Sequence, residues 1–166
     1  MQLSGLIHSF PKELKLLIGV FIIVLSIGFF TGLLFVGKTS SANPNGIEEQ
    51  YLGNESDENA TVMKFKKSDQ EMLTLVHNHV LSMSIIFFLV GAILSVTQLN
   101  RKLKLFLMIE PFLSVLLTFG GIYLLWKGML WMKYLVMFSG TLMTLTFTAA
   151  AGIILIQLFQ NKSVKT

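Results

Sequence analysis

Four long apolar stretches restrict the folds open to this chain more than any other feature of its sequence. They cover residues 14–36, 73–99, 103–126 and 134–159. Each is longer than the about 20 helical residues that cross the hydrocarbon core of a bilayer. The stretches are continuously apolar rather than alternating, which excludes membrane β-strands. We therefore predict an all-α, polytopic membrane protein, one membrane domain over residues 1–166 in which antiparallel up-down hairpins form a bundle of four transmembrane helices.

The composition agrees with a chain that lives in lipid. Hydrophobic residues make up 53% of the sequence and charged residues 13%, whereas a soluble domain carries about 25% charged residues. The chain has no cysteine, which excludes disulfides, thiolate metal sites and cysteine nucleophiles. The net charge of +4 comes from cations that flank the spans. We expect these cations to meet the lipid bilayer and not nucleic acid.

Local signals mark where the helices begin. Pro11, with Glu13 in the first turn, is typical of a helix start. The sequence Ser68-Asp69-Gln70-Glu71 has the pattern of a capping box and predicts that the second helix begins near Asp69. Asn100 and Arg101 leave only a short turn between spans two and three, so these two helices are predicted to be antiparallel neighbours.

The basic residues predict the orientation in the membrane. The two termini and the turn between spans two and three carry seven Lys and Arg residues, and the opposite side carries six. The compact turn at 100–104 holds three of the seven, and short cytoplasmic loops are typically basic. We predict that both termini are cytoplasmic, that the loop 38–70 is extracytoplasmic, and that the membrane is a bacterial inner membrane.

Small residues recur along one side of each predicted span. Such residues let transmembrane helices approach closely, because lipid is as apolar as a leucine side chain and packing must come from shape and hydrogen bonds. In span three, Glu110, Ser114 and Gly121 share a narrow arc. In the other spans the residues predicted to lie at helix contacts are Gly28, Gly32, Gly91, Gly140, Thr144, Thr148 and Gly152.

Three ionisable residues fall inside the spans: His77, His79 and Glu110. Such residues are costly in lipid and are therefore candidates for function. The two histidines point about 200° apart on a helix, so they do not chelate one metal ion and we predict no metal site. His77 falls on the small and polar side with Ser84, and is predicted to face inward. His79 is predicted to face the interface or a partner.

Haem b is an alternative role for His77 or His79. Imidazole is a good axial ligand, and helical membrane bundles can hold a haem between helices. The second ligand would come from a methionine, another copy or another chain, because the remaining histidine, His8, is predicted on the opposite side.

Glu110 is followed by Pro111, which removes a backbone donor and kinks helices. A carboxyl group beside such a kink can bind a proton or a cation. It can equally be a neutral acid that hydrogen-bonds a neighbouring side chain.

No nucleotide-binding loop, nucleophile elbow or pair of intramembrane carboxylates is present in the sequence. We therefore predict a non-enzymatic protein, an accessory or scaffolding subunit that associates with other membrane subunits or with copies of itself. The alternatives are a small b-type haem subunit for electron transfer, which uses His77 or His79, and a proton or ion transporter, which uses Glu110 and His77.

Overall fold

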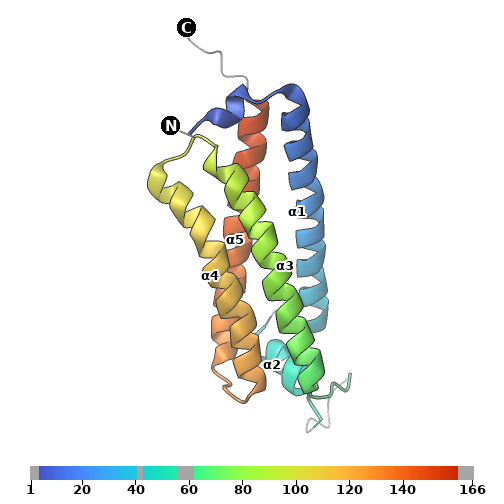
Figure 1. Cartoon of the computed structure of the whole chain (residues 1–166). Coiled ribbons are helices and arrows are strands. Elements are labelled where there is room, and N and C mark those ends of the chain that lie inside the picture. Colours follow the sequence, from blue (N-terminus) through green and yellow to red (C-terminus); the bar gives the residue numbers. More distant parts are fainter. Residues whose placement is uncertain (1–3, 41–42, 56–61, 161–166) are drawn as a thin grey trace.

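Four long helices dominate the computed structural model, which describes residues 4–40, 43–55 and 62–160 (Figure 1). Each of them is long and apolar enough to span a membrane, and the described residues include no strand. The predicted all-α architecture with four spans is confirmed. The elements in chain order are η1 (Leu6–Ser9), α1 (Lys12–Ser40), α2 (Pro44–Leu52), α3 (Asp69–Ser95), α4 (Arg101–Trp126) and α5 (Met132–Phe159).

The bundle has two distinct ends. At the end that we call the terminal end, η1 lies beside the α3–α4 connection and the last turn of α5 (Figure 1). There the backbone N–H groups of Gly5 and Ile7 both donate to the carbonyl of Val96, at 3.1 and 3.2 Å. Gln157 of α5 donates to the carbonyl of Gln98 at 2.9 Å. The opposite end, which we call the capped end, is covered by α2.

The predicted start of α3 is confirmed, because Ser68 and Glu71 form the complete capping box. The helix ends at Ser95, four residues before the predicted end of the apolar stretch at Leu99. Lys104 explains why the chain can leave the helix there. Its Nζ donates to the carbonyls of Ser95 and Thr97, at 3.0 and 2.6 Å, and so satisfies acceptors that a helix end leaves unpaired.

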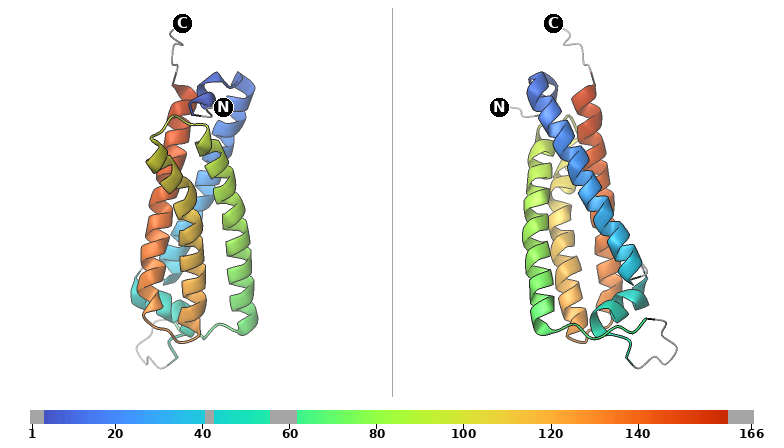
Figure 2. Two further views of the ribbon diagram at one scale, coloured as in Figure 1. Left: turned by 60° about the vertical axis from the view of Figure 1, so that its left-hand side comes forward. Right: turned by 90° about the vertical axis from the view of Figure 1, so that its right-hand side faces the viewer.

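The helices α4 and α5 form the tightest pair. Their buried faces contact along most of their length, and the hydroxyls of Thr118 and Ser139 hydrogen-bond across the interface at 2.7 Å. Gly121 permits this approach, because a Cβ at that position would lie 2.9 Å from Cγ2 of Val136. The helix α3 packs on α4, and α1 runs obliquely along α5 (Figure 2).

The helix α2 was not predicted from the sequence. Asn43 accepts a hydrogen bond from the Gly46 amide as the N-cap, and Pro44 occupies the first turn, a combination that typically starts a helix. Only glycine fits at position 46, since a Cβ there would lie 1.9 Å from the carbonyl oxygen of Ser40. The apolar face of α2 buries Ile47, and a short ion pair of 2.6 Å joins Glu48 to Lys133 of α5.

The extended segment that leads into α3 completes the capped end. The backbone of Lys67 makes one hydrogen bond as a donor and one as an acceptor. The Lys67 amide donates to the carbonyl of Tyr51, and the indole Nε1 of Trp126 donates to the carbonyl of Lys67 at 2.8 Å. Lys127 lies over the Trp126 ring, with Nζ 4.4 Å from the ring centroid. The described part of the loop therefore lies against the bundle, as a layer over α4 and α5.

Candidate functional site

Glu110 is buried in the bundle, as its place on the polar arc of span three suggested. The residue is 7% exposed, and its Oε1 accepts a hydrogen bond from the hydroxyl of Ser114, one turn further along α4. Its second oxygen, Oε2, is buried and has no hydrogen-bond partner among the described residues. Pro111 lies next to it inside the helix. The site therefore combines a carboxyl group in apolar surroundings with one unused oxygen.

Buried hydroxyls continue from Glu110 toward the capped end. Ser114, Thr118 and Ser139 are each buried at the interface of α4 and α5. Ser139 donates to the carbonyl of Leu135 at 2.8 Å, so Thr118 is the donor in the bond between Thr118 and Ser139. We call Glu110, Ser114, Thr118 and Ser139 the polar seam. All four side chains are buried within membrane-spanning helices of the described chain.

The prediction that His77 faces inward is wrong. The structure leaves His77 exposed, whereas the ring of His79 lies 4.7 Å from the ring of Phe119, centroid to centroid. The Nδ1 atom of His79 also hydrogen-bonds to the carbonyl of Leu75 at 2.8 Å. The inward face of α3 carries Met72 and Val90, which lie on the same side as His79, the residue predicted to face the interface or a partner. Of the residues assigned to the inward side of span two, Gly91 is buried, whereas His77 is not.

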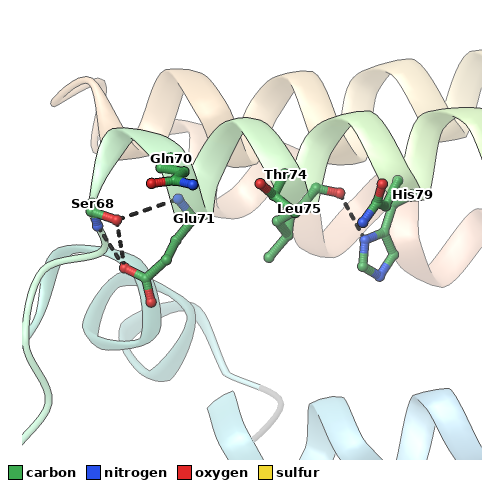
Figure 3. Close-up of a pocket in the computed structure, with 7 residues that line it drawn as sticks. Ser68, Gln70, Glu71, Thr74, Leu75 and His79 are labelled. Carbon is green, nitrogen blue, oxygen red and sulfur yellow. Dashed lines mark hydrogen bonds between the residues drawn. The ribbon is translucent and has the colours of Figure 1, made fainter.

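A shallow groove of about 450 Å³ lies beside the first turns of α3 (Figure 3). Figure 3 shows the carboxylate of Glu71 turned back onto Ser68, with His79 two turns further along the helix. The groove is lined by Ser68, Gln70, Glu71, Thr74, Leu75, Asn78 and His79. Its carboxylate is thus already used in capping, and the groove is open rather than enclosed.

Haem binding at His77 or His79 stays a prediction. Both residues are exposed, and the ring of His79 lies against that of Phe119. His8 lies in η1 at the terminal end, so within this chain it does not pair with either of them. No group of three or more His, Asp or Glu residues that could hold a metal ion occurs in residues 4–40, 43–55 and 62–160.

Exposed polar side chains extend along α3 from the capped end into the bundle. Gln70, Thr74, His77 and Asn78 are all exposed and lie on one side of the helix. We call these four residues the polar face of α3. His79, the next residue, is level with Phe119 of α4. Phe119 lies seven residues before Trp126, which is about 10 Å at the rise of an α-helix.

At that depth the neighbouring helices expose large apolar side chains. On α4, Leu116 is 60% exposed, and Leu117 is exposed beside it. On α5, Phe138 is 65% exposed, next to Ser139, whose contact with Thr118 places it at the same level. The polar face of α3 therefore lies where α4 and α5 present surfaces suited to lipid.

Most of the small residues predicted at helix contacts do not lie at contacts within the chain. A Cβ at Gly28, Gly32, Gly140 or Gly152 would meet nothing within 4 Å, outside its own helix's backbone. Thr144 and Thr148 bond only to carbonyls of their own helix. Gly91 is the exception in this set, because a Cβ there would lie 3.9 Å from Met108 of α4. The buried side of α5 instead carries Val136, Ser139, Met143, Phe147, Ala150 and Ile154.

Residues 41–165 match the model of the Aq_1264_TM family, which is described as a transmembrane helical domain. The chain belongs to this family. The matched range covers α2, α3, α4 and α5, and α1 precedes it. No curated protein and no solved structure matches the chain significantly. Together with the four apolar helices, the family match makes the chain an integral membrane protein.

Proposed function

We propose that this member of the Aq_1264_TM family is a non-enzymatic accessory or scaffolding subunit of a larger membrane complex. The partner binds to the polar face of α3 through a transmembrane helix that carries hydrogen-bonding side chains. The observation that carries this proposal is the depth of the polar face, which lies beside exposed leucine and phenylalanine side chains of α4 and α5.

Lipid cannot satisfy the groups of this face. An amide or imidazole group in hydrocarbon loses its hydrogen bonds to water, and transmembrane helices regain such bonds by pairing with each other. The Thr74, His77 and Asn78 side chains are exposed together on one side of α3. Three such groups within two helical turns suit a second helix that donates and accepts hydrogen bonds.

The outer side of α1 gives independent support. Gly28 and Gly32 are one turn apart, and nothing in the chain lies beside either of them. A pair of glycines at this spacing allows the backbone of another helix to approach closely. Because a Cβ at either glycine would meet no other part of the chain within 4 Å, these glycines are open to another subunit.

Photo-crosslinking in native membranes tests the proposed interface. A photoreactive residue at His77 is expected to form an adduct with one polypeptide of the complex, and the same residue at Phe138 is the depth-matched control that labels lipid. Asn78→Leu, introduced with the probe at His77, should reduce the adduct severalfold because it removes a hydrogen-bonding group of the face. Adducts with lipid alone from both positions, or with a second copy of this chain, would contradict a hetero-complex.

The orientation belongs to the same proposal. The terminal end, with both termini, faces the cytoplasm of a bacterial cell, and the capped end faces outward, as the basic residues at 101–104 favour. The chain has no cysteine, so a single introduced cysteine is the only residue of this chain that offers a thiol to the maleimide. Glu55→Cys at the capped end should react with an impermeant maleimide in intact cells, and Lys102→Cys at the terminal end should react only after lysis. The reverse pattern would invert the topology.

A further inference from the structure

The polar seam carries an inference that is independent of the proposed interface. It joins a carboxyl group to three hydroxyls, and all four side chains are buried between α4 and α5. Polar side chains at such a place cost free energy, and a structural role needs hydrogen bonds for each of them. Glu110 does not fully meet that condition, because its Oε2 has no partner.

No cation among the described residues compensates a negative charge on Glu110. The ion pairs of the described residues join Lys67 to Glu71, Lys127 to Asp69 and Lys133 to Glu48, all at the capped end. The side chains packed around the middle of the bundle are mostly apolar, with Phe87 of α3 and Phe147 of α5 in ring contact, and the buried Thr146 hydroxyl bonds to carbonyls of its own helix. A charged Glu110 would therefore lie in these surroundings without a counter-ion among the described residues.

We propose that Glu110 is an intramembrane proton-binding site that exchanges its proton with the capped end through the hydroxyls of the polar seam. Ser114 donates to Oε1 and is thus the group through which a proton reaches the carboxyl. Thr118 and Ser139 continue the row beyond it. Ser114 and Thr118 are one helical turn apart, about 5–6 Å between their Cβ atoms, a gap that one water molecule bridges.

The exchange needs no oxidant and no leaving group. When Glu110 is a carboxylate, the Ser114 hydroxyl proton passes to Oε1 and a new O–H bond forms there. The Ser114 oxygen takes a proton from the bridging water in the same step. The Thr118 hydroxyl, which otherwise donates to Ser139, turns to that water and reprotonates it, and Thr118 in turn takes the Ser139 proton, which is replaced from water at the capped end. The reverse sequence releases the proton. One O–H bond breaks for each one that forms.

Infrared spectroscopy of the full chain in lipid vesicles tests the site. The difference spectrum between the parent and Glu110→Gln should contain the carbonyl stretch of one neutral carboxylic acid. That band should shift in D₂O and should not change when sodium ions replace potassium ions. A missing band would overturn the proposal, because the carboxyl would then be ionised. A band that changes with sodium would contradict the proposal, because the site would then bind a cation. A band that never shifts in D₂O would also contradict it, because Glu110 would then be a structural acid that does not exchange its proton.

The rate of the shift tests the route. Thr118→Val keeps the shape of the side chain and removes a hydroxyl of the seam, so it should slow the deuterium shift of the Glu110 band severalfold. Thr144→Val is the matched control, because the Thr144 hydroxyl bonds only to the Gly140 carbonyl of its own helix. Circular dichroism and gel filtration of both variants check that the fold is retained. Equal rates in the two variants would contradict exchange along the seam.

Discussion

The helices α1 and α4 are both apolar spans of similar length, yet they relate to the bundle in opposite ways. Half of the most apolar 18-residue window of α4 is buried, against 11% of that of α1. The surroundings of the glycines differ between the two helices in the same way. Gly121 of α4 lies against Val136, whereas Gly28 and Gly32 of α1 face empty space. A glycine in an apolar span is therefore a packing residue only when its helix turns that side toward another helix.

What holds α1 is a small number of specific contacts. Phe29 stacks on Phe147 of α5 with ring centroids 4.1 Å apart, and the side chains of Ile18 and Ile22 are buried. At the terminal end, Lys15 Nζ donates to the carbonyl of His8 at 3.0 Å. The family match covers the chain from residue 41, which leaves α1 outside it. The matched range thus includes α4 and α5, the tightest pair of the structure.

The largest expected effect comes from overfilling the tight interface. Gly121→Leu forces a side chain into the contact with Val136 and should destabilise the bundle by about 1–3 kcal/mol, the usual cost of overpacking a filled core. The yield of monodisperse protein in mild detergent measures this. Gly32→Leu is the control and should leave the isolated chain unchanged. An equal loss of monodisperse protein in both variants would mean that these sides of α1 and α4 are packed equally tightly.

The two histidines give the next largest contrast. His79→Ala removes a ring contact with Phe119, which is worth about 0.5–1.5 kcal/mol for aromatic pairs. His77→Ala should leave the stability of the isolated chain unchanged and weaken association with the partner. Thermal unfolding in detergent measures the first effect, and co-purification from native membranes measures the second. If His77→Ala destabilises the isolated chain as much as His79→Ala, the helical phase described for α3 is wrong.

A smaller effect is expected from one hydrogen bond between α4 and α5. Thr118→Val removes the bond to Ser139 and should cost about 0.6 kcal/mol, the average for side-chain hydrogen bonds between transmembrane helices. Thr31→Val in α1 removes an exposed hydroxyl that bonds only to Gly28 of its own helix. Its effect on unfolding in detergent should be close to zero. A larger loss for Thr31→Val would reverse the comparison between the two helices.

The smallest effect concerns the docking of α2. Burial raises the pKa of the Tyr51 hydroxyl above its ordinary value of 10.0. The neutral form is favoured in the docked helix, so docking is fully stable below pH 10.0 and weakens as the pH rises above that value, where an undocked tyrosine ionises first. Ultraviolet titration should show one of the three tyrosines ionising late, and Tyr51→Phe should remove that late step. A late step that persists in Tyr51→Phe would assign it to another tyrosine.

The sequence predicted the features that depend on length and on local signals. The four spans follow from the apolar runs, and the start of α3 follows from the capping box at Ser68 and Glu71. The polar arc of Glu110, Ser114 and Gly121 was also identified correctly as buried. The spans and the start of α3 do not depend on which side of a helix faces inward. The inward side of span three could be predicted because it carries strongly polar groups.

For the other helices, the side that faces the bundle could not be predicted in this way. Leu107 is buried and Leu105 is 58% exposed on the same helix, because lipid accepts leucine as readily as the bundle interior does. The hydrophobic pattern that orients helices in soluble proteins is therefore nearly absent here. For this reason the inward face of α3 was assigned to the wrong side, and the glycines of α1 and α5 were assigned to contacts.

The central functional claim is that the polar face of α3 is covered by protein in the membrane. Spin labels at Asn78, Leu117 and Phe138, each on a single cysteine, can be compared in native membranes by their collisions with oxygen and with a water-soluble nickel complex. We predict that the label at Asn78 is shielded from both, whereas the labels at Leu117 and Phe138 collide readily with oxygen. If the nickel complex reaches Asn78 as freely as it reaches a label at the exposed Gln70, the face lies in water and the proposed interface does not exist.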